Sequence, residues 1–175
     1  MKVDLNKVEE VSKGHGSFAV WREGDIDDLS IIPESQQDLH GRVIFIGTNA
    51  SGEIPAWRNF HSTHQGGRDG WLADTIGRNP KLRGAYMTDF FKGDYSIKET
   101  GVEVSPEIIQ KNLDILKKEI ALFEEDKPIL AAFGNKTSKL LTELGFKVKC
   151  LPHYARIGIT REEFSQAIKE LSEKL

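Results

Sequence analysis

The sequence predicts an α/β fold, a three-layer α/β/α sandwich around a four-stranded parallel sheet. From residue 42 onward, short apolar stretches alternate with longer stretches of helical periodicity, which is typical of parallel sheets covered by helices. Residues 42–47 (RVIFIG) form a continuous apolar stretch, as expected for a strand buried on both faces. The 175 residues have the length of one domain, with a cap over 1–41 and an α/β core over 42–175.

The first half of the core is predicted to contain two strands separated by a helix. The strand over 42–47 is followed by a helix over 69–80, where apolar residues recur at helical spacing until an Asn-Pro pair. The second strand is predicted over 84–91 (GAYMTDFF). This order of elements is that of a parallel crossover unit.

The second half of the core continues the same alternation. The predicted elements are a helix over 105–126, a strand over 128–133, a helix over 135–145, a strand over 146–151 and a helix over 160–175. Ser105 can cap the longest helix, and Pro106 suits its first turn. Thr160 and Glu163 have the spacing of a capping box at the start of the last helix.

Residues 1–41 fit this alternation poorly. They hold nine Asp or Glu residues against four Lys or Arg residues. We interpret them as a leading helix or an irregular cap over one edge of the sheet.

Composition limits the possible functions. A net charge of −3 argues against broad electrostatic attraction to nucleic acid, although a local basic groove remains possible. The chain has no apolar stretch of the roughly 20 residues needed to span a bilayer, and its first residues lack a signal-peptide core. We therefore expect a cytoplasmic protein without a membrane partner, and a monomer. Cys150 lies in a strand-like stretch and is expected to be a buried, inert thiol.

The polar residues of the core gather where the predicted strands end. The four strand exits read GTNASG, DFFKGD, GNKT and PHYARIG. Ligands of open parallel sheets bind beyond the carboxyl ends of the strands, so these exits predict the functional site. The general polarity of loops explains part of this pattern.

These exits, in their order, resemble the uracil-DNA glycosylase superfamily, and the mismatch-specific branch most closely. The similarity lies in VIFIGTNAS, AWRNFH, ILAAFGNKT and VKCLPHYARIG, which together span roughly residues 42 to 160. The resemblance implies the spatial strand order 2-1-3-4. It also implies a hydrolase that excises a damaged or deaminated base flipped out of DNA. No cofactor or metal is expected.

The resemblance also implies roles for individual residues. Asn49 matches the position that holds the attacking water, and His153 the position that stabilises the leaving base. Phe60 matches the aromatic residue that stacks on the base, and Asp89 lies near the base-reading asparagine. The remaining expected site residues are Gly47, Thr48, Ser51, Asn135, Tyr154 and Arg156. Gly47 and Thr48 are expected to let the backbone approach the base.

The sequence departs from the family pattern at several of these positions. Ala50 stands in place of a proline, and Tyr154-Ala155 follows His153 where Pro-Ser is expected. Ile157 is the candidate for the wedge residue that follows this motif. An ionised Asp89 offers only hydrogen-bond acceptors, unlike asparagine, so the site is expected to favour a base edge with N–H donors over uracil.

Each site residue also has a purely structural interpretation, as a turn, core or capping residue. At the level of the whole protein, a non-catalytic protein that binds a nucleotide, a base or a nucleic-acid segment is the main alternative to a glycosylase acting on DNA with a damaged base. A nucleotide hydrolase is a third, weaker possibility. The five Arg and Lys residues within 58–83 could line a phosphate-binding groove or form a solvated charged surface.

Overall fold

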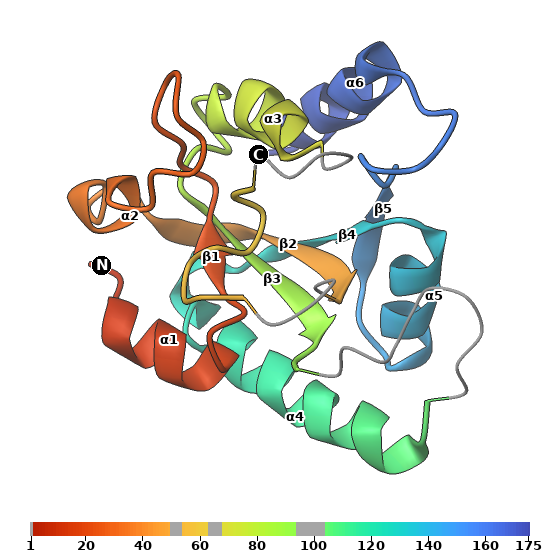
Figure 1. The fold of residues 1–175 in the computed structure, drawn as a ribbon. Helices are drawn as coiled ribbons and strands as arrows, with labels where there is room; N and C mark the ends of the chain where they lie inside the picture. The colour runs from red at the N-terminus through yellow and green to blue at the C-terminus, as the bar shows by residue number, and fades with distance from the viewer. Residues whose placement is uncertain (1, 50–53, 63–67, 94–103) are drawn as a thin grey trace.

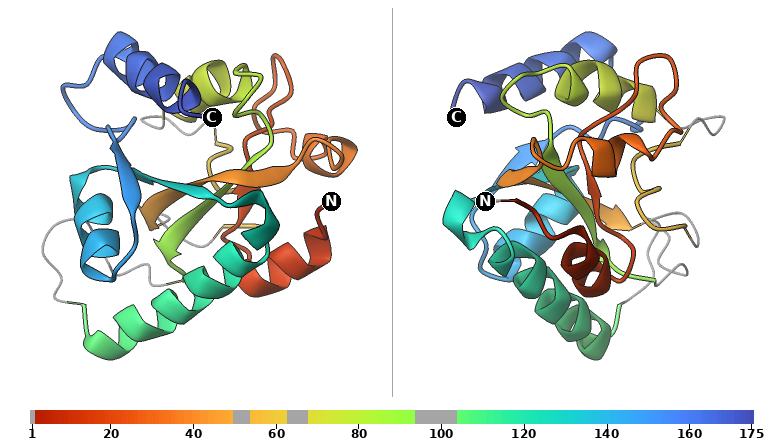
Figure 2. Two further views of the ribbon diagram at one scale, coloured as in Figure 1. Left: turned by 180° about the vertical axis from the view of Figure 1, so that it is seen from behind. Right: turned by 90° about the vertical axis from the view of Figure 1, so that its left-hand side faces the viewer.

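The computed structural model describes residues 2–49, 54–62, 68–93 and 104–175, and it is a three-layer α/β/α arrangement (Figure 1). The strands are β1 (Ser17–Phe18), β2 (His40–Asn49), β3 (Ala85–Phe91), β4 (Ile129–Phe133) and β5 (Val148–Leu151). The α-helices are α1 (Leu5–Ser12), α2 (Ile31–Glu34), α3 (Asp69–Leu72), α4 (Pro106–Ala121), α5 (Asn135–Glu143) and α6 (Arg161–Ser172). The sheet lies between α3 and α6 on one face and α1, α4 and α5 on the other, as both views of Figure 2 show.

The sheet has five strands in the order β1-β3-β2-β4-β5. The four predicted strands are parallel neighbours in the order β3-β2-β4-β5, which is 2-1-3-4 when only those strands are numbered. The prediction of a four-stranded, all-parallel sheet is nevertheless wrong, because β1 pairs antiparallel with β3. β1 is two residues long, too short to show any periodicity within the stretch predicted as a cap.

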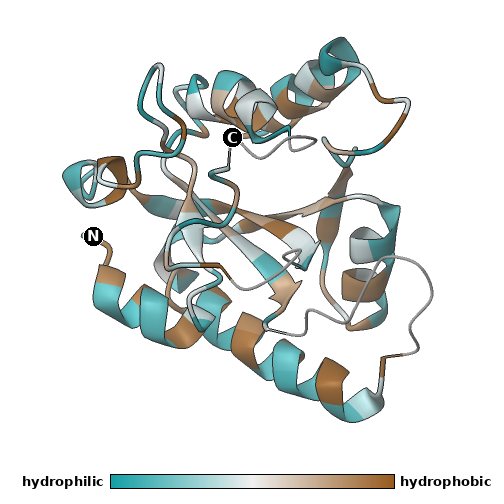
Figure 3. Cartoon of the chain, viewed as in Figure 1, coloured by the Kyte–Doolittle hydropathy of each residue, from teal (hydrophilic) through white to brown (hydrophobic). Residues whose placement is uncertain are grey.

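The central strand β2 is buried on both faces, as its continuous apolar stretch predicts. Ile44 and Ile46 belong to the hydrophobic cluster under α1, α4 and α5. Val43 and Phe45 belong to the cluster under α3 and α6. Adjacent strand residues point to opposite faces, so one apolar strand contributes to two cores. Figure 3 shows the apolar strands between amphipathic helices, with α4 alternating between polar and apolar residues along its length.

The predicted caps are present at the ends of the core helices. The Ser105 hydroxyl accepts a hydrogen bond from the Ile108 amide (3.4 Å), with Pro106 at the first position of α4. Thr160 and Glu163 form the capping box of α6. The helix predicted over 69–80 is shorter, because α3 passes into a π-helical turn, η1 (Ala73–Gly77). A Cβ on Gly77 would lie 2.5 Å from Trp21 Cε3, so the glycine lets Trp21 pack against this turn.

The N-terminal residues cover one edge of the sheet. α1 lies beside α4 (Figure 1), and Val8 joins the core between them. Among the described residues, no helix has the length and apolar character required to cross a membrane.

Cys150 corrects one expectation, because its side chain is exposed rather than buried. β5 is an edge strand, so its outward positions contact solvent. The Cys150 thiol donates a hydrogen bond to Asn135 Oδ1 (3.3 Å).

Candidate functional site

The carboxyl ends of the parallel strands meet at one edge of the molecule. Gly47 is paired with Asp89, and Asn49 with Phe91, at the ends of β2 and β3. The neighbouring exits of β4 and β5 lead into α5 and into the loop that begins at Pro152. The edge predicted from the polar strand exits is therefore formed by adjacent chain segments.

The centre of this edge is a contact among Gly47, Asp89 and Phe60. A Cβ placed on Gly47 would lie 2.2 Å from Asp89 Oδ1 and 3.4 Å from Phe60 Cζ. The first distance is far below van der Waals contact, so position 47 tolerates no side chain while Asp89 keeps its rotamer. The glycine is therefore explained by the Asp89 carboxylate, whereas the sequence suggested close approach of a base.

Asp89 is almost completely buried, with 3% of its surface exposed. Its Oδ2 accepts a hydrogen bond from Asn59 Nδ2 (2.9 Å), and the same amide nitrogen donates to the His15 carbonyl (2.9 Å). Burial raises the pKa of Asp89 to about 6, although the Asn59 hydrogen bond and the Lys92 charge act in the opposite direction. Sequence reasoning missed Asn59, since one asparagine in a loop carries no distinctive pattern.

The segment that carries Asn59 and Phe60 has an unusual backbone. Trp57 and Phe60 both have left-handed φ values, 66° and 65°. Bulky residues rarely adopt this conformation, which costs on the order of 1 kcal/mol or more at each position. The Phe60 carbonyl accepts a hydrogen bond from Trp21 Nε1 (3.3 Å), and His61 stacks on Trp21 at 4.9 Å between ring centroids. These contacts fix the position of Phe60, whose ring lies beside Gly47.

His61 is a core residue of this segment. Its Nε2–H donates to the Phe18 carbonyl (3.1 Å), and burial lowers its pKa to about 4. No group of three or more His, Cys, Asp or Glu side chains suited to a metal ion occurs among the residues that the structure describes.

Two predicted site residues point elsewhere. The Thr48 hydroxyl lies 2.6 Å from the Thr137 hydroxyl on α5, so strand alternation places it on the face opposite Gly47. Asn135 is exposed at the start of α5 and contacts Cys150. The hydrogen bonds of these two side chains therefore lie at α5 and β5 rather than at Asp89. Strand alternation places the Asn49 side chain on the same face of the sheet as Gly47. Ser51 lies outside the described residues.

His153 and Tyr154 follow β5 and approach the same cluster. Their rings stack, with centroids 5.1 Å apart and an angle of 14° between planes. His153 Nδ1 accepts a hydrogen bond from the Ala155 amide (3.2 Å), so a proton on this ring lies on Nε2. Tyr154 also packs edge-on against Phe133 (5.4 Å) in the core.

Asp69 is a second buried carboxyl group at this edge, and sequence reasoning missed it. Its Oδ2 accepts a hydrogen bond from the Ser62 amide (3.0 Å), and the Tyr154 hydroxyl donates to its carboxylate. Burial raises the pKa of Asp69. Burial, followed by the charges of Asp69 and Asp89, raises the pKa of Tyr154 well above its usual value. The Tyr154 hydroxyl is thus electrostatically coupled to both carboxylates.

Arg68 holds the loop after Tyr154. Its guanidinium lies 4.5 Å from the centroid of a Trp71 ring. Its Nη1 is 3.4 Å from each of three carbonyl oxygens of the loop, those of Tyr154, Arg156 and Ile159. Within this loop Arg156 is exposed, and the Ile157 side chain is 93% exposed.

A buried ion pair lies beneath β3 on the side of α4. Lys92 Nζ is 2.8 Å from Glu119 Oε2, and it also donates to the Thr88 hydroxyl and the Asp89 carbonyl. Glu119 Oε1 accepts hydrogen bonds from the Tyr86 hydroxyl (2.6 Å) and the Thr88 hydroxyl (2.7 Å). The lysine is therefore fully paired while it contacts the backbone of Asp89.

The arginines of the basic stretch 58–83 are mostly engaged within the protein. Arg58 Nη1 lies 2.5 Å from Asp27 Oδ1, and Arg78 Nη2 lies 3.6 Å from Asp74 Oδ1. Lys81 donates to the Ser172 carbonyl (3.1 Å). These contacts favour the interpretation of the stretch as a charged surface over that of a phosphate-binding groove.

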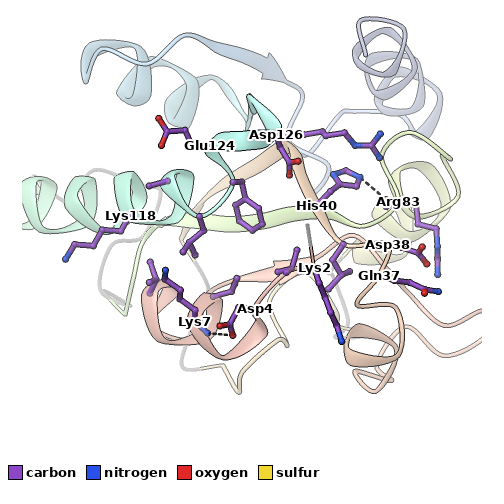
Figure 4. A pocket seen from close by; sticks show the side chains of 18 of the residues that line it. Lys2, Asp4, Lys7, Gln37, Asp38, His40, Arg83, Lys118, Glu124 and Asp126 are labelled. Carbon is purple, nitrogen blue, oxygen red and sulfur yellow. Dashed lines mark hydrogen bonds between the residues drawn. The ribbon is translucent and has the colours of Figure 1, made fainter.

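A cavity of about 1290 Å³ lies at the opposite end of the sheet (Figure 4). His40 and Arg42 at the start of β2, with Phe123 after α4, help to line it. In Figure 4 the labelled lysine side chains, Lys2, Lys7 and Lys118, diverge around the rim and are interspersed with carboxylates, so they form no single anion site. None of the predicted site residues lines this cavity.

A scan of the chain against models of known protein families found no match, and a search among curated proteins found none either.

Proposed function

We propose that the protein is a DNA N-glycosylase, which hydrolyses the bond between a damaged or deaminated base and deoxyribose at the carboxyl edge of β2 and β3. The observation that carries the proposal is Ile157, which is 93% exposed on a loop held by Arg68. The loop follows Tyr154, whose pKa is raised by burial and by the charges of Asp69 and Asp89. Apolar side chains of this kind insert between base pairs in enzymes and architectural proteins that distort duplex DNA. The resemblance in sequence supports the same assignment.

In this proposal Asn49 holds the attacking water at the end of β2. An amide orients water without being a strong base, which is sufficient when the glycosidic bond is already breaking. Phe60 and Asp89 both lie next to Gly47, and the Phe60 ring stacks on the base. His153 supplies its Nε2–H toward the leaving base. The positions of these residues at one edge are compatible with the reaction.

The non-catalytic alternative is favoured by a specific observation. Asp89 is 3% exposed. Its carboxylate already accepts a hydrogen bond from Asn59 and occupies the space that a side chain on Gly47 would take. A side chain so enclosed can have a purely structural role, with the edge retained only for binding.

A panel of duplex oligonucleotides distinguishes the two functions. Each duplex carries uracil, hypoxanthine, xanthine or a mismatched base, and alkaline strand cleavage reports abasic sites. Abasic sites made by the wild type, and lost in Asn49→Ala, are expected for the glycosylase. The matched control is Glu143→Gln, an exposed substitution on α5. Binding without abasic sites on any duplex would instead establish the non-catalytic function.

A further inference from the structure

The cavity at the amino ends of the parallel strands is formed by segments far apart in the sequence. Residues of α1, of β2 and of the chain after α4 contribute to its lining. Its apolar wall includes Val3, Leu122 and Phe123, and Val3 and Leu122 are only partly buried. A Cβ on Gly41 would lie 2.1 Å from Phe123 Cβ, so the glycine lets Phe123 pack against β2. The volume of about 1290 Å³ is sufficient for a small organic ligand, since such sites commonly measure roughly 300–1000 Å³.

The guanidinium groups at this cavity lack partners within the protein. Most other arginines are engaged through ion pairs, hydrogen bonds or a cation–π contact, namely Arg22, Arg58, Arg68, Arg78 and Arg161. Among the described residues, the side chains of Arg42, Arg83 and Arg156 form no such contact. Arg42 and Arg83 both line the cavity. Two of the three unengaged arginines are therefore found at one place.

The carboxylates of the lining do not neutralise these arginines. The lining holds five Lys or Arg residues against four Asp or Glu residues, in a chain whose net charge is −3. The carboxylates of Asp4 and Asp126 accept hydrogen bonds from backbone amides (3.2 and 2.6 Å). The other two, Asp38 and Glu124, are exposed to solvent. Because no carboxylate of the described chain pairs with them, both guanidinium groups are available to a ligand.

His40 adds a polar group that is not satisfied within the protein. Its Nε2–H donates to the Arg83 carbonyl (3.0 Å), and the ring lies between Asp126 and Arg83 in Figure 4. Burial lowers the pKa of His40 to about 4, so the ring is neutral near pH 7. Nδ1 is then a buried acceptor, and it has no hydrogen-bond partner among the described residues. Buried acceptors are nearly always paired in native proteins, so a donor is missing here that a bound molecule or an ordered water supplies.

We propose that this cavity binds a small organic phosphate, with the phosphate group on Arg42 and Arg83 and the apolar body against Leu122 and Phe123. Guanidinium groups bind phosphate through paired N–H donors, and the apolar wall gains from burial of the body. A phosphate monoester carries more negative charge than a carboxylate, which suits two unengaged guanidinium groups. The site lies at the opposite end of the sheet from Asp89, so the proposal does not depend on the glycosylase function.

The anionic group is tested with three probes that share one aromatic body. These are 1-naphthyl phosphate, 1-naphthoate and the uncharged 1-naphthol, and calorimetric titration measures their affinities. We expect the phosphate to bind at least about tenfold more tightly than the naphthol, because a hydrogen bond to a charged group commonly contributes that factor or more. The naphthoate should be intermediate. Inorganic phosphate, which lacks the apolar body, should bind more weakly than 1-naphthyl phosphate.

Two variants show whether the cavity arginines cause the preference. Arg42→Gln and Arg83→Gln each remove one guanidinium and keep a polar side chain, so each should weaken binding of 1-naphthyl phosphate severalfold. Lys139→Gln removes one exposed positive charge from α5 and should leave binding unchanged. Circular dichroism establishes that each variant is folded. A shift of the His40 ring resonance in NMR titrations, assigned with His40→Gln, locates the probe in the cavity.

The outcomes separate the parts of the proposal. Tighter binding of 1-naphthyl phosphate that is lost in both arginine variants and retained in Lys139→Gln supports it. Absence of binding, equal binding of the phosphate and the naphthol, or unchanged binding in both arginine variants overturns it. Naphthoate bound as tightly as the phosphate overturns the assignment of a phosphate ligand. Inorganic phosphate bound as tightly as 1-naphthyl phosphate overturns the role of the apolar wall.

Discussion

Replacing Lys92 by methionine removes an ammonium from the protein interior while keeping most of the length of the side chain. The Lys92 and Glu119 side chains are 1% and 0% exposed, and their charged atoms lie 2.8 Å apart. The substitution leaves Glu119 as an unpaired buried carboxylate. Breaking one partner of such a pair typically costs about 3–5 kcal/mol. Because this is a large part of the roughly 5–15 kcal/mol that stabilises a domain, we expect a lower unfolding midpoint and a partly unfolded population at 37 °C.

Urea unfolding followed by tryptophan fluorescence measures this loss. In thermal unfolding, each kcal/mol of lost stability lowers the melting temperature by about 2–4 °C in a domain of this size. The melting temperature of Lys92→Met should therefore fall by roughly 6–20 °C. The double variant Lys92→Met/Glu119→Gln removes both charges and should regain much of the lost stability. A loss below about 1 kcal/mol in Lys92→Met, or a double variant no more stable than the single one, would refute the assignment of a buried ion pair.

Four further predictions concern the candidate site. Gly47→Ala places a methyl group 2.2 Å from Asp89 Oδ1, so it should lower the free energy of unfolding in urea by about 1–3 kcal/mol. The double variant Gly47→Ala/Asp89→Ala should relieve the clash. A single variant as stable as the wild type would show that Asp89 moves freely. Burial raises the pKa of Asp89 from the usual 3.8 to about 6, so the folded state binds the proton more tightly than the unfolded state. The stability of the wild type should therefore fall, relative to that of Asp89→Asn, as the pH rises from about 4 to 6. Unfolding of both proteins across that range tests the sign, and a parallel pH dependence would contradict it. Asn49→Ala should lower the single-turnover rate of base release about 10²-fold or more while binding of damaged DNA stays nearly constant; full activity would remove Asn49 from the mechanism. Ile157→Ala should weaken excision from duplex DNA more than from single strands without changing the melting temperature, whereas equal effects on both substrates would argue against insertion into the duplex.

The helices and strands of the core could be predicted because their sequence patterns are local. The continuous apolar stretch of β2 and the caps at Ser105 and Thr160 are physical requirements of the elements themselves. β1 could not be predicted, because a two-residue strand depends on its pairing partner and not on its own pattern.

The buried polar residues were harder to predict, although one signal existed. Glu119 and Asn112 lie on the apolar face of α4, three or four residues from Leu116, and a polar residue within an apolar stripe marks a buried partner. That partner, Lys92, could not be identified without the three-dimensional structure, since it follows β3 and lies far from Glu119 in the sequence. The roles assigned to Asn49 and His153 from the sequence resemblance stay predictions.

The two-sided burial of β2 also has a consequence for the order of folding. Phe45 has Met87 as its neighbour in β3 and Ala131 as its neighbour in β4, both far along the chain. One edge of the apolar strand β2 therefore stays unpaired during folding until β4 has joined the sheet. Pairing of segments that are distant in the sequence slows folding and leaves a partly folded, aggregation-prone intermediate. We expect refolding yield to depend steeply on protein concentration, even where the native protein shows no tendency to aggregate.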